Sequence, residues 1–142
     1  MSRILALDFG SKTVGVAVSD PLLFTATGIE IIRRERENKL RQTLARIVEL
    51  VDEYKPIKIV LGLPLMPEGD EGERCEKTRE FAEMLKSRVD IPIVFQDERL
   101  TTVEAEEIMD GLGIARKDYK AYVDMVAAKV ILEDYLNGKD NL

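Results

Sequence analysis

Acidic residues occupy positions in this sequence where an apolar residue would be expected. Asp8 ends one short apolar run, Glu98 follows another, and Asp124 lies among the apolar residues of the last helical segment. The chain has no histidine and one cysteine, so carboxylates are its main means of holding a metal ion. Mg²⁺ and similar hard cations prefer oxygen ligands, whereas zinc usually takes His and Cys. These residues therefore favour an Mg²⁺- or Mn²⁺-dependent reaction on a phosphodiester, where paired cations can activate water and stabilise the leaving oxygen.

Each of these acids also has a purely structural explanation. Asp8 could cap the turn that follows it, and acids such as Asp97 and Glu98 are favoured where a helix begins. Asp124 could be a boundary residue in the first turns of its helix. The functional reading has its own support, because ligands of open α/β sheets bind beyond the carboxyl ends of the strands, where Asp8 and either Asp97 or Glu98 are expected. An ionised Asp124 on an apolar helix face also needs a compensating metal ion, arginine or helix N-terminus.

Basic residues gather in two segments of the chain. One group precedes the first long helix and contains Arg33, Arg34, Arg36, Lys39 and Arg41. The other precedes the last helix and contains Arg116, Lys117 and Lys120. Such groups are usually solvated surfaces. Because the second group is near Asp124 in the sequence, we predict that it binds a nucleic-acid backbone without reading bases, together with Lys12 and Arg99.

Length and composition limit the classes of protein that this chain can be. Its 142 residues suit one domain, 1–142, and the net charge of -6 argues against a protein that simply coats nucleic acid. No apolar stretch is long enough to span a membrane, and the N-terminus does not resemble a signal peptide. The single Cys75 cannot form an internal disulfide, which fits a cytoplasmic location. Because the charged residues Arg74 and Glu76 flank it on a predicted helix, we expect a surface thiol. The lack of histidine excludes Ser-His-Asp and Cys-His catalytic sites.

The pattern of apolar residues predicts an α/β fold. Predicted strands cover 3–9, 14–19, 26–33, 58–63 and 91–95, and the first two form a hairpin. Predicted helices cover 40–54, 73–88, 101–109 and 117–136, with a loop at 64–72. Three strands followed by alternating helices and strands indicate a mixed sheet.

Four motifs in this order make the chain resemble a known family. They are Asp8-Phe9-Gly10-x-Lys12-x-x-Gly15, then Gly62-Leu63-Pro64-Leu65 with Glu71-Gly72, then Asp97-Glu98-Arg99-Leu100-Thr101-Thr102, then Asp124-x-x-Ala127-Ala128. The chain is similar, from residue 3 to about residue 136, to the YqgF or RuvX family, bacterial relatives of the RuvC Holliday-junction resolvases. The resemblance implies an RNase H-like fold, with a five-stranded mixed sheet flanked by helices on both faces.

The resemblance also implies an activity. Asp8, Glu98 and Asp124 match the acids to which the family's metal-dependent endonuclease activity is ascribed. The implied substrate is structured nucleic acid, either the 5′ end of pre-16S rRNA or, as the alternative, branched DNA, cleaved by a monomer or a homodimer. A second alternative is a non-catalytic RNA-binding factor in ribosome assembly. An ATP-binding protein with an RNase H-like fold needs a second phosphate-binding hairpin in a second domain, for which this chain is too short.

The sequence departs from the family at one position. Many members have Asn-Met after Gly-Leu-Pro-Leu, where this chain has Met66-Pro67. A polar role for position 66 is therefore not expected here, and the role of the 64–72 loop stays open.

Overall fold

The computed structural model describes residues 2–66, 68–98 and 101–138 and contains a five-stranded mixed sheet. The strands are β1 (Ile4–Phe9), β2 (Thr13–Ser19), β3 (Ala26–Arg33), β4 (Lys58–Leu63) and β5 (Ile93–Asp97). They lie in the order β3-β2-β1-β4-β5. The first three strands pair antiparallel, and β4 is parallel to both β1 and β5. The carboxyl ends of β1, β4 and β5 therefore meet at one end of the sheet.

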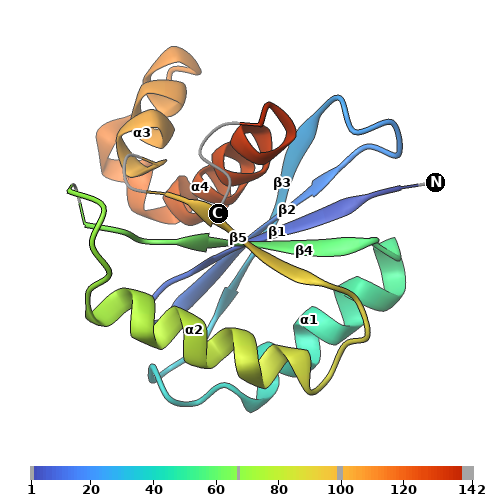
Figure 1. The fold of residues 1–142 in the computed structure, drawn as a ribbon. Helices are drawn as coiled ribbons and strands as arrows, with labels where there is room; N and C mark the ends of the chain where they lie inside the picture. Colours follow the sequence, from blue (N-terminus) through green and yellow to red (C-terminus); the bar gives the residue numbers. More distant parts are fainter. Residues whose placement is uncertain (1, 67, 99–100, 139–142) are drawn as a thin grey trace.

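Helices cover both faces of this sheet (Figure 1). They are α1 (Arg41–Tyr54), α2 (Glu73–Lys86), α3 (Thr101–Gly111) and α4 (Tyr119–Leu136), with a short 3-10 turn, η1 (Arg116–Asp118), before α4. α1 and α2 pack on one face, and α4 lies across the other with α3 beside it. Among the described residues, no helix is both long and apolar enough to cross a membrane.

Alternation along β1 divides the core between the two faces. Leu5, Leu7 and Phe9 pack with residues of α1 and α2, whereas Ile4 and Ala6 pack with the apolar side of α4. Successive side chains of a strand point to opposite faces, so Asp8 continues the row of Ile4 and Ala6 and faces α4. The face of the sheet that carries Asp8 is thus the face that carries the last helix.

Two predicted elements begin later in the structure than the sequence pattern indicated. The fifth strand runs from Ile93 to Asp97 rather than over 91–95, because its ladder with β4 joins Ile59 to Ile93 and Leu63 to Asp97. Pro92 has no N–H for such a ladder. The last helix begins at Tyr119 rather than near Lys117, since η1 takes up the residues before it.

The position of the single cysteine differs from the expected surface thiol. Cys75 lies in the first turn of α2 and is fully buried instead of exposed, with its Sγ 3.4 Å from the carbonyl oxygen of Pro64. The prediction of a surface thiol was wrong because Cys75 lies on the inward side of α2, together with Thr78 and Phe81.

Candidate acidic site

Asp8 and Glu98 meet at the carboxyl end of the sheet. Asp8 is the fifth residue of β1, and Glu98 directly follows β5, so β4 lies between them. Their carboxyl groups share a side-chain hydrogen bond. Asp97, the other acid that the sequence left open here, is a buried residue inside β5 and pairs with Leu63 in the ladder. Glu98 is therefore the acid of this segment that reaches Asp8.

A glycine in β4 makes room for this contact. A Cβ atom added to Gly62 would lie 2.9 Å from the carboxyl carbon of Glu98 and 2.5 Å from Cδ1 of Ile131 in α4. Real Cβ atoms do not approach other atoms so closely. The missing side chain lets the Glu98 carboxyl group lie over β4 on the side of the sheet that faces α4.

Burial raises the pKa of both carboxyl groups, and their contact acts on the two pKa values in opposite directions. Burial, first of all, raises the pKa of Asp8 from its ordinary value of 3.8 to about 6, and the nearby charge of Asp124 raises it further. Burial also raises the pKa of Glu98 well above its ordinary value, followed by the charge of Asp8. Their hydrogen bond lowers the pKa of Asp8 and raises that of Glu98, so the protonated Glu98 donates to the Asp8 carboxylate. Two carboxylates in contact repel one another, so the pair favours a shared proton or an added cation.

Asp124 lies beside this pair on α4. Its Oδ2 accepts a hydrogen bond from Oγ1 of Thr13, at 2.6 Å, across 111 residues of sequence. The helix can lie this close because β2 has a glycine beneath it: a Cβ atom on Gly15 would be 1.9 Å from the backbone oxygen of Asp124. Gly15 pairs with Asp8 in the β1–β2 ladder. Thr13 and Gly15 thus place Asp124 against the hairpin whose first strand carries Asp8.

The structure brings the predicted acids together without making a finished metal site. Among the residues that it describes, no three His, Cys, Asp or Glu side chains are grouped closely enough to hold a metal ion. Nor does any of the three acids form an ion pair with a Lys or Arg within the described ranges. Their donors are all carboxylate oxygens, which suits Mg²⁺ or Mn²⁺. A raised pKa at Asp8 and Glu98 is also the condition that a bound cation would relieve.

Arg74 is a cation near the acids that the sequence pattern did not predict. Arg74, near the start of α2, lowers the pKa of both Asp8 and Glu98 through its charge, although burial outweighs it. Its guanidinium lies 5.7 Å from the ring centre of Phe9 and forms an ion pair with Glu37. Its Nη2 is buried and has no hydrogen-bond partner within the described part of the chain. Only its position just after the 64–72 loop could have drawn attention to it.

The residues predicted to bind nucleic acid are only partly placed by the structure. Lys12 is exposed in the hairpin turn next to Thr13, close to the acids. Arg116 and Lys117 are exposed on η1, ahead of the helix that carries Asp124. Arg99 lies outside the described residues, and so does the side chain of Lys120.

The described part of the 64–72 loop is tied down by its own contacts. Met66 N donates to the Asp70 carbonyl, Gly69 N donates to the Met66 carbonyl, and Glu71 forms an ion pair with Arg79 of α2. Gly69 has a φ of 95°, which favours glycine. Met66 is exposed and offers no polar side chain, and Pro67 lies outside the described residues.

Relatives with known names match almost the whole chain. A protein of Agathobacter rectalis named "Putative pre-16S rRNA nuclease" is 57% identical over 139 residues, covering 98% of this chain and 97% of that protein. A protein of Lachnospira eligens with the same name is 46% identical over 137 residues, covering 96% and 98%.

Solved structures of junction resolvases have the same fold. T. thermophilus RuvC in complex with a Holliday junction substrate superposes with a TM-score of 0.59 and 13% identity, covering 97% of this chain and 95% of that chain. The fowlpox virus Holliday junction resolvase gives a TM-score of 0.60 and 14% identity, covering 96% and 98%. These likenesses confirm the predicted RNase H-like fold.

The model of one protein family, described as "RuvX: Holliday junction resolvase", matches residues 2–138. That match and the relatives at 57% and 46% identity confirm the family that the four sequence motifs indicated. The chain is a member of the RuvX family.

Proposed function

We propose that the chain acts as a single nuclease domain that cleaves the 5′ end of pre-16S rRNA with the help of Mg²⁺ or Mn²⁺. The observation that carries this proposal is the hydrogen bond between the carboxyl groups of Asp8 and Glu98, with Asp124 beside them. The substrate comes from the relatives, which are named for pre-16S rRNA.

Asp8, Glu98 and Asp124 would hold the cation. A bound Mg²⁺ or Mn²⁺ would supply an activated water and charge stabilisation for the phosphodiester. The residues around the three acids hold their carboxylates in position for the cation. Thr13 holds one oxygen of Asp124, so the second oxygen is left for a ligand. Gly62 leaves the space in which Glu98 reaches Asp8, so the two carboxylates can act on the same cation.

A polyanionic substrate would bind near the acids through exposed cationic side chains. Lys12 beside the acids, and Arg116 and Lys117 ahead of α4, are exposed and would contact the phosphates that flank the cleaved bond. Such contacts let a chain with a net charge of -6 bind nucleic acid locally.

A second candidate activity is resolution of branched DNA. It is favoured by the description of the family model, which names Holliday junction resolvases. It would use the same acids, so the two activities differ in substrate and not in the site.

Cleavage assays separate these activities. The purified protein is incubated with Mn²⁺ or Mg²⁺ and, in parallel, with a 5′-extended 16S rRNA precursor and a four-way DNA junction. We expect cleavage of the rRNA precursor, loss of cleavage in EDTA, and loss in Asp8→Asn. The matched control is Asp52→Asn, which removes an exposed carboxylate of α1 and should cleave normally.

Two results would contradict the proposal. Cleavage of the junction alone would move the function to branched DNA. Binding of the precursor without cleavage, identical in Asp8→Asn and the unaltered protein, would indicate a non-catalytic RNA-binding factor.

A further inference from the structure

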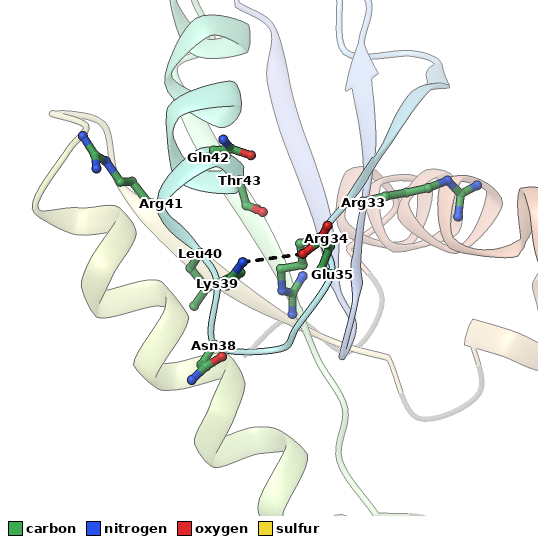
Figure 2. Close-up of a pocket in the computed structure, with 9 residues that line it drawn as sticks. All are labelled: Arg33, Arg34, Glu35, Asn38, Lys39, Leu40, Arg41, Gln42 and Thr43. Carbon is green, nitrogen blue, oxygen red and sulfur yellow. Dashed lines mark ion pairs between the residues drawn. The ribbon is translucent and has the colours of Figure 1, made fainter.

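Four of the nine residues that line a pocket at the start of α1 are cationic. The pocket has a volume of about 770 Å³ and lies where the chain passes from β3 into α1 (Figure 2). We call its cations the basic strip: they are Arg33, Arg34, Lys39 and Arg41. Glu35 is the acid among the lining residues. The pocket therefore has an excess of positive charge although the chain as a whole is acidic.

The pocket lies at the same end of the sheet as the acids. Arg33 pairs with Thr13 across the β2–β3 ladder, and Thr13 donates its hydroxyl hydrogen to Asp124. Arg34 reaches the adjoining turn, since its Nη2 donates to the carbonyl oxygens of Gly10 (2.6 Å) and Ser11 (2.9 Å). Ile32 packs on the α1 side of the sheet, so the neighbouring Arg33 points to the α4 side, whereas Arg34 lies over Phe9 on the α1 side. The basic strip thus runs around the end of the sheet, from the side that carries the acids to the start of α1.

Most of the positive charge in the strip is not neutralised. Arg33 and Arg41 are exposed, and within the described ranges no carboxylate forms an ion pair with either of them. Lys39 pairs with Glu35 at 3.5 Å, but both side chains are mostly exposed, and such surface pairs contribute little.

Arg34 is held more firmly than the other cations of the strip. Its guanidinium lies 4.9 Å from the ring centre of Phe9, and its Nη1 is buried without a hydrogen-bond partner among the described residues. The neighbouring N-terminus of α1 has no side-chain cap and no acid in its first turn, so it adds to the positive potential.

The arrangement of the side chains indicates what kind of anion would fit. In Figure 2 Arg33 and Arg41 point in opposite directions, and Arg34 and Lys39 lie between them. A site for one small anion needs donors that converge on it. Cations spread along a surface instead match the repeated phosphates of a nucleic-acid strand.

We propose that the basic strip binds the sugar–phosphate backbone of the nucleic acid whose cleavage is assigned to the acids. This rests on the proposed function, because the strip and the acids would contact one continuous substrate around the end of the β1–β2 hairpin. The strip contacts backbone and not bases, so it adds affinity without sequence preference.

Binding in the absence of metal tests this proposal independently of cleavage. Fluorescein-labelled single-stranded RNA of random sequence is titrated with the full chain in EDTA, and anisotropy is followed over a series of salt concentrations. The variant is Arg33→Glu/Arg41→Glu. The matched control, Lys86→Glu/Arg88→Glu, makes the same charge change on exposed residues at the carboxyl end of α2 and just beyond it. Circular dichroism and denaturant unfolding verify that both variants fold.

We expect the strip variant to bind at least about ten times more weakly and its salt slope to fall by about 1.4, which is about 0.7 for each of two lost phosphate contacts on a single strand. The control should stay within about twofold of the unaltered protein. Equal weakening in both variants would show a general effect of charge and overturn the proposal, as would failure of the unaltered protein to bind RNA.

Competition with inorganic phosphate distinguishes a site for a nucleic-acid strand from a site for a single free anion. If phosphate displaces the RNA from the unaltered protein no better than chloride of matched ionic strength, the strip binds a strand, as proposed. If phosphate displaces it more strongly, and does so only while Arg33 and Arg41 are present, the pocket is a site for a single free anion and the proposal is wrong. RNA binding retained in Asp8→Asn, with cleavage lost, would show that the strip binds the strand independently of the acids, as proposed.

Discussion

The carboxyl group of Glu98 reaches that of Asp8 across β4 and forms a hydrogen bond with it. Two carboxyl groups can share a hydrogen bond only while one of them holds a proton. The pair therefore links folding and protonation and, under the proposed function, metal binding at one place in the molecule. Each link leads to a measurement.

The stability of the metal-free protein should depend on pH through Asp8. Its pKa is about 6 in the folded chain, above its ordinary value of 3.8, so the folded state binds more protons between these values. Stability from this group is then present at low pH and is lost as pH rises through about 6. Asp8→Asn removes the group, so the variant should be more stable than the unaltered protein at pH 7, and this advantage should shrink towards pH 5.

Denaturant unfolding in EDTA at several pH values measures this difference. The difference between the two proteins is the useful quantity, because carboxylates with a lowered pKa, such as Glu30 and Glu71, lose their stabilising ion pairs as pH falls. Parallel stability curves for the two proteins would show that Asp8 does not titrate in this range.

Divalent cations should stabilise the folded chain. A ligand that binds only the folded state at about 100 times its Kd adds about 2.7 kcal/mol to the free energy of unfolding. We expect Mg²⁺ or Mn²⁺ to raise Tm relative to EDTA, and more so at pH 7.5 than at pH 5.5, because protons compete for the same oxygens. Differential scanning fluorimetry of the unaltered protein, Glu98→Gln and Asp52→Asn measures this.

The two variants have opposite expected outcomes in that experiment. Glu98→Gln removes a proposed ligand and should lose the metal-dependent rise in Tm. Asp52→Asn should keep it. An identical rise in Glu98→Gln would place the cation elsewhere.

The hydroxyl of Thr13 should matter for activity through Asp124. Thr13→Val removes the donor of the 2.6 Å hydrogen bond to Asp124 Oδ2 and frees this carboxylate to turn. Loss of a residue that orients a metal ligand typically reduces metal affinity or activity by about 10- to 100-fold. The cleavage rate as a function of Mn²⁺ concentration measures this loss, and Thr13→Ser, which keeps the hydroxyl, should restore most of it. A Thr13→Val protein with normal cleavage would remove Thr13 from the site.

A methyl group at position 62 should disturb the site more than the fold. In Gly62→Ala the three atoms nearest to the new Cβ belong to side chains, namely the carboxyl group of Glu98 and Cδ1 of Ile131, and both can move aside. We therefore expect a loss of about 1 kcal/mol in stability, as for mild overpacking. Cleavage should fall much more, since Glu98 is displaced from Asp8.

A second glycine serves as the matched control for that variant. A Cβ atom on Gly111 at the end of α3 would meet, within 4 Å, no described atom apart from its chain neighbours and the backbone of its own helix, so Gly111→Ala should leave cleavage unchanged. Unfolding curves and cleavage rates of both variants give the comparison. Equal activity in Gly62→Ala and Gly111→Ala would contradict the proposed path of Glu98 over β4.

The sequence by itself determined the family and the order of the elements, and it singled out the acids that are proposed for the site. Apolar runs and helical periodicity predicted every strand and helix, because each depends on local alternation and spacing. Asp8 and Glu98 were recognisable since each follows such a run, and Asp124 since it interrupts the apolar face of its helix. The errors were local as well: the fifth strand is displaced towards Asp97, where pairing with β4 sets its limits, and Cys75 is inside.

Only the tertiary structure decided how these residues meet. It chose Glu98 over Asp97 as the partner of Asp8, joined Thr13 to Asp124, and brought Arg74 near the acids. It also showed that the basic residues before α1 line a pocket at the same end of the sheet as the acids. The physical reason is that these contacts join residues far apart in the chain. The order of the strands and the close approach of α4 over glycines set them, and no local pattern records either.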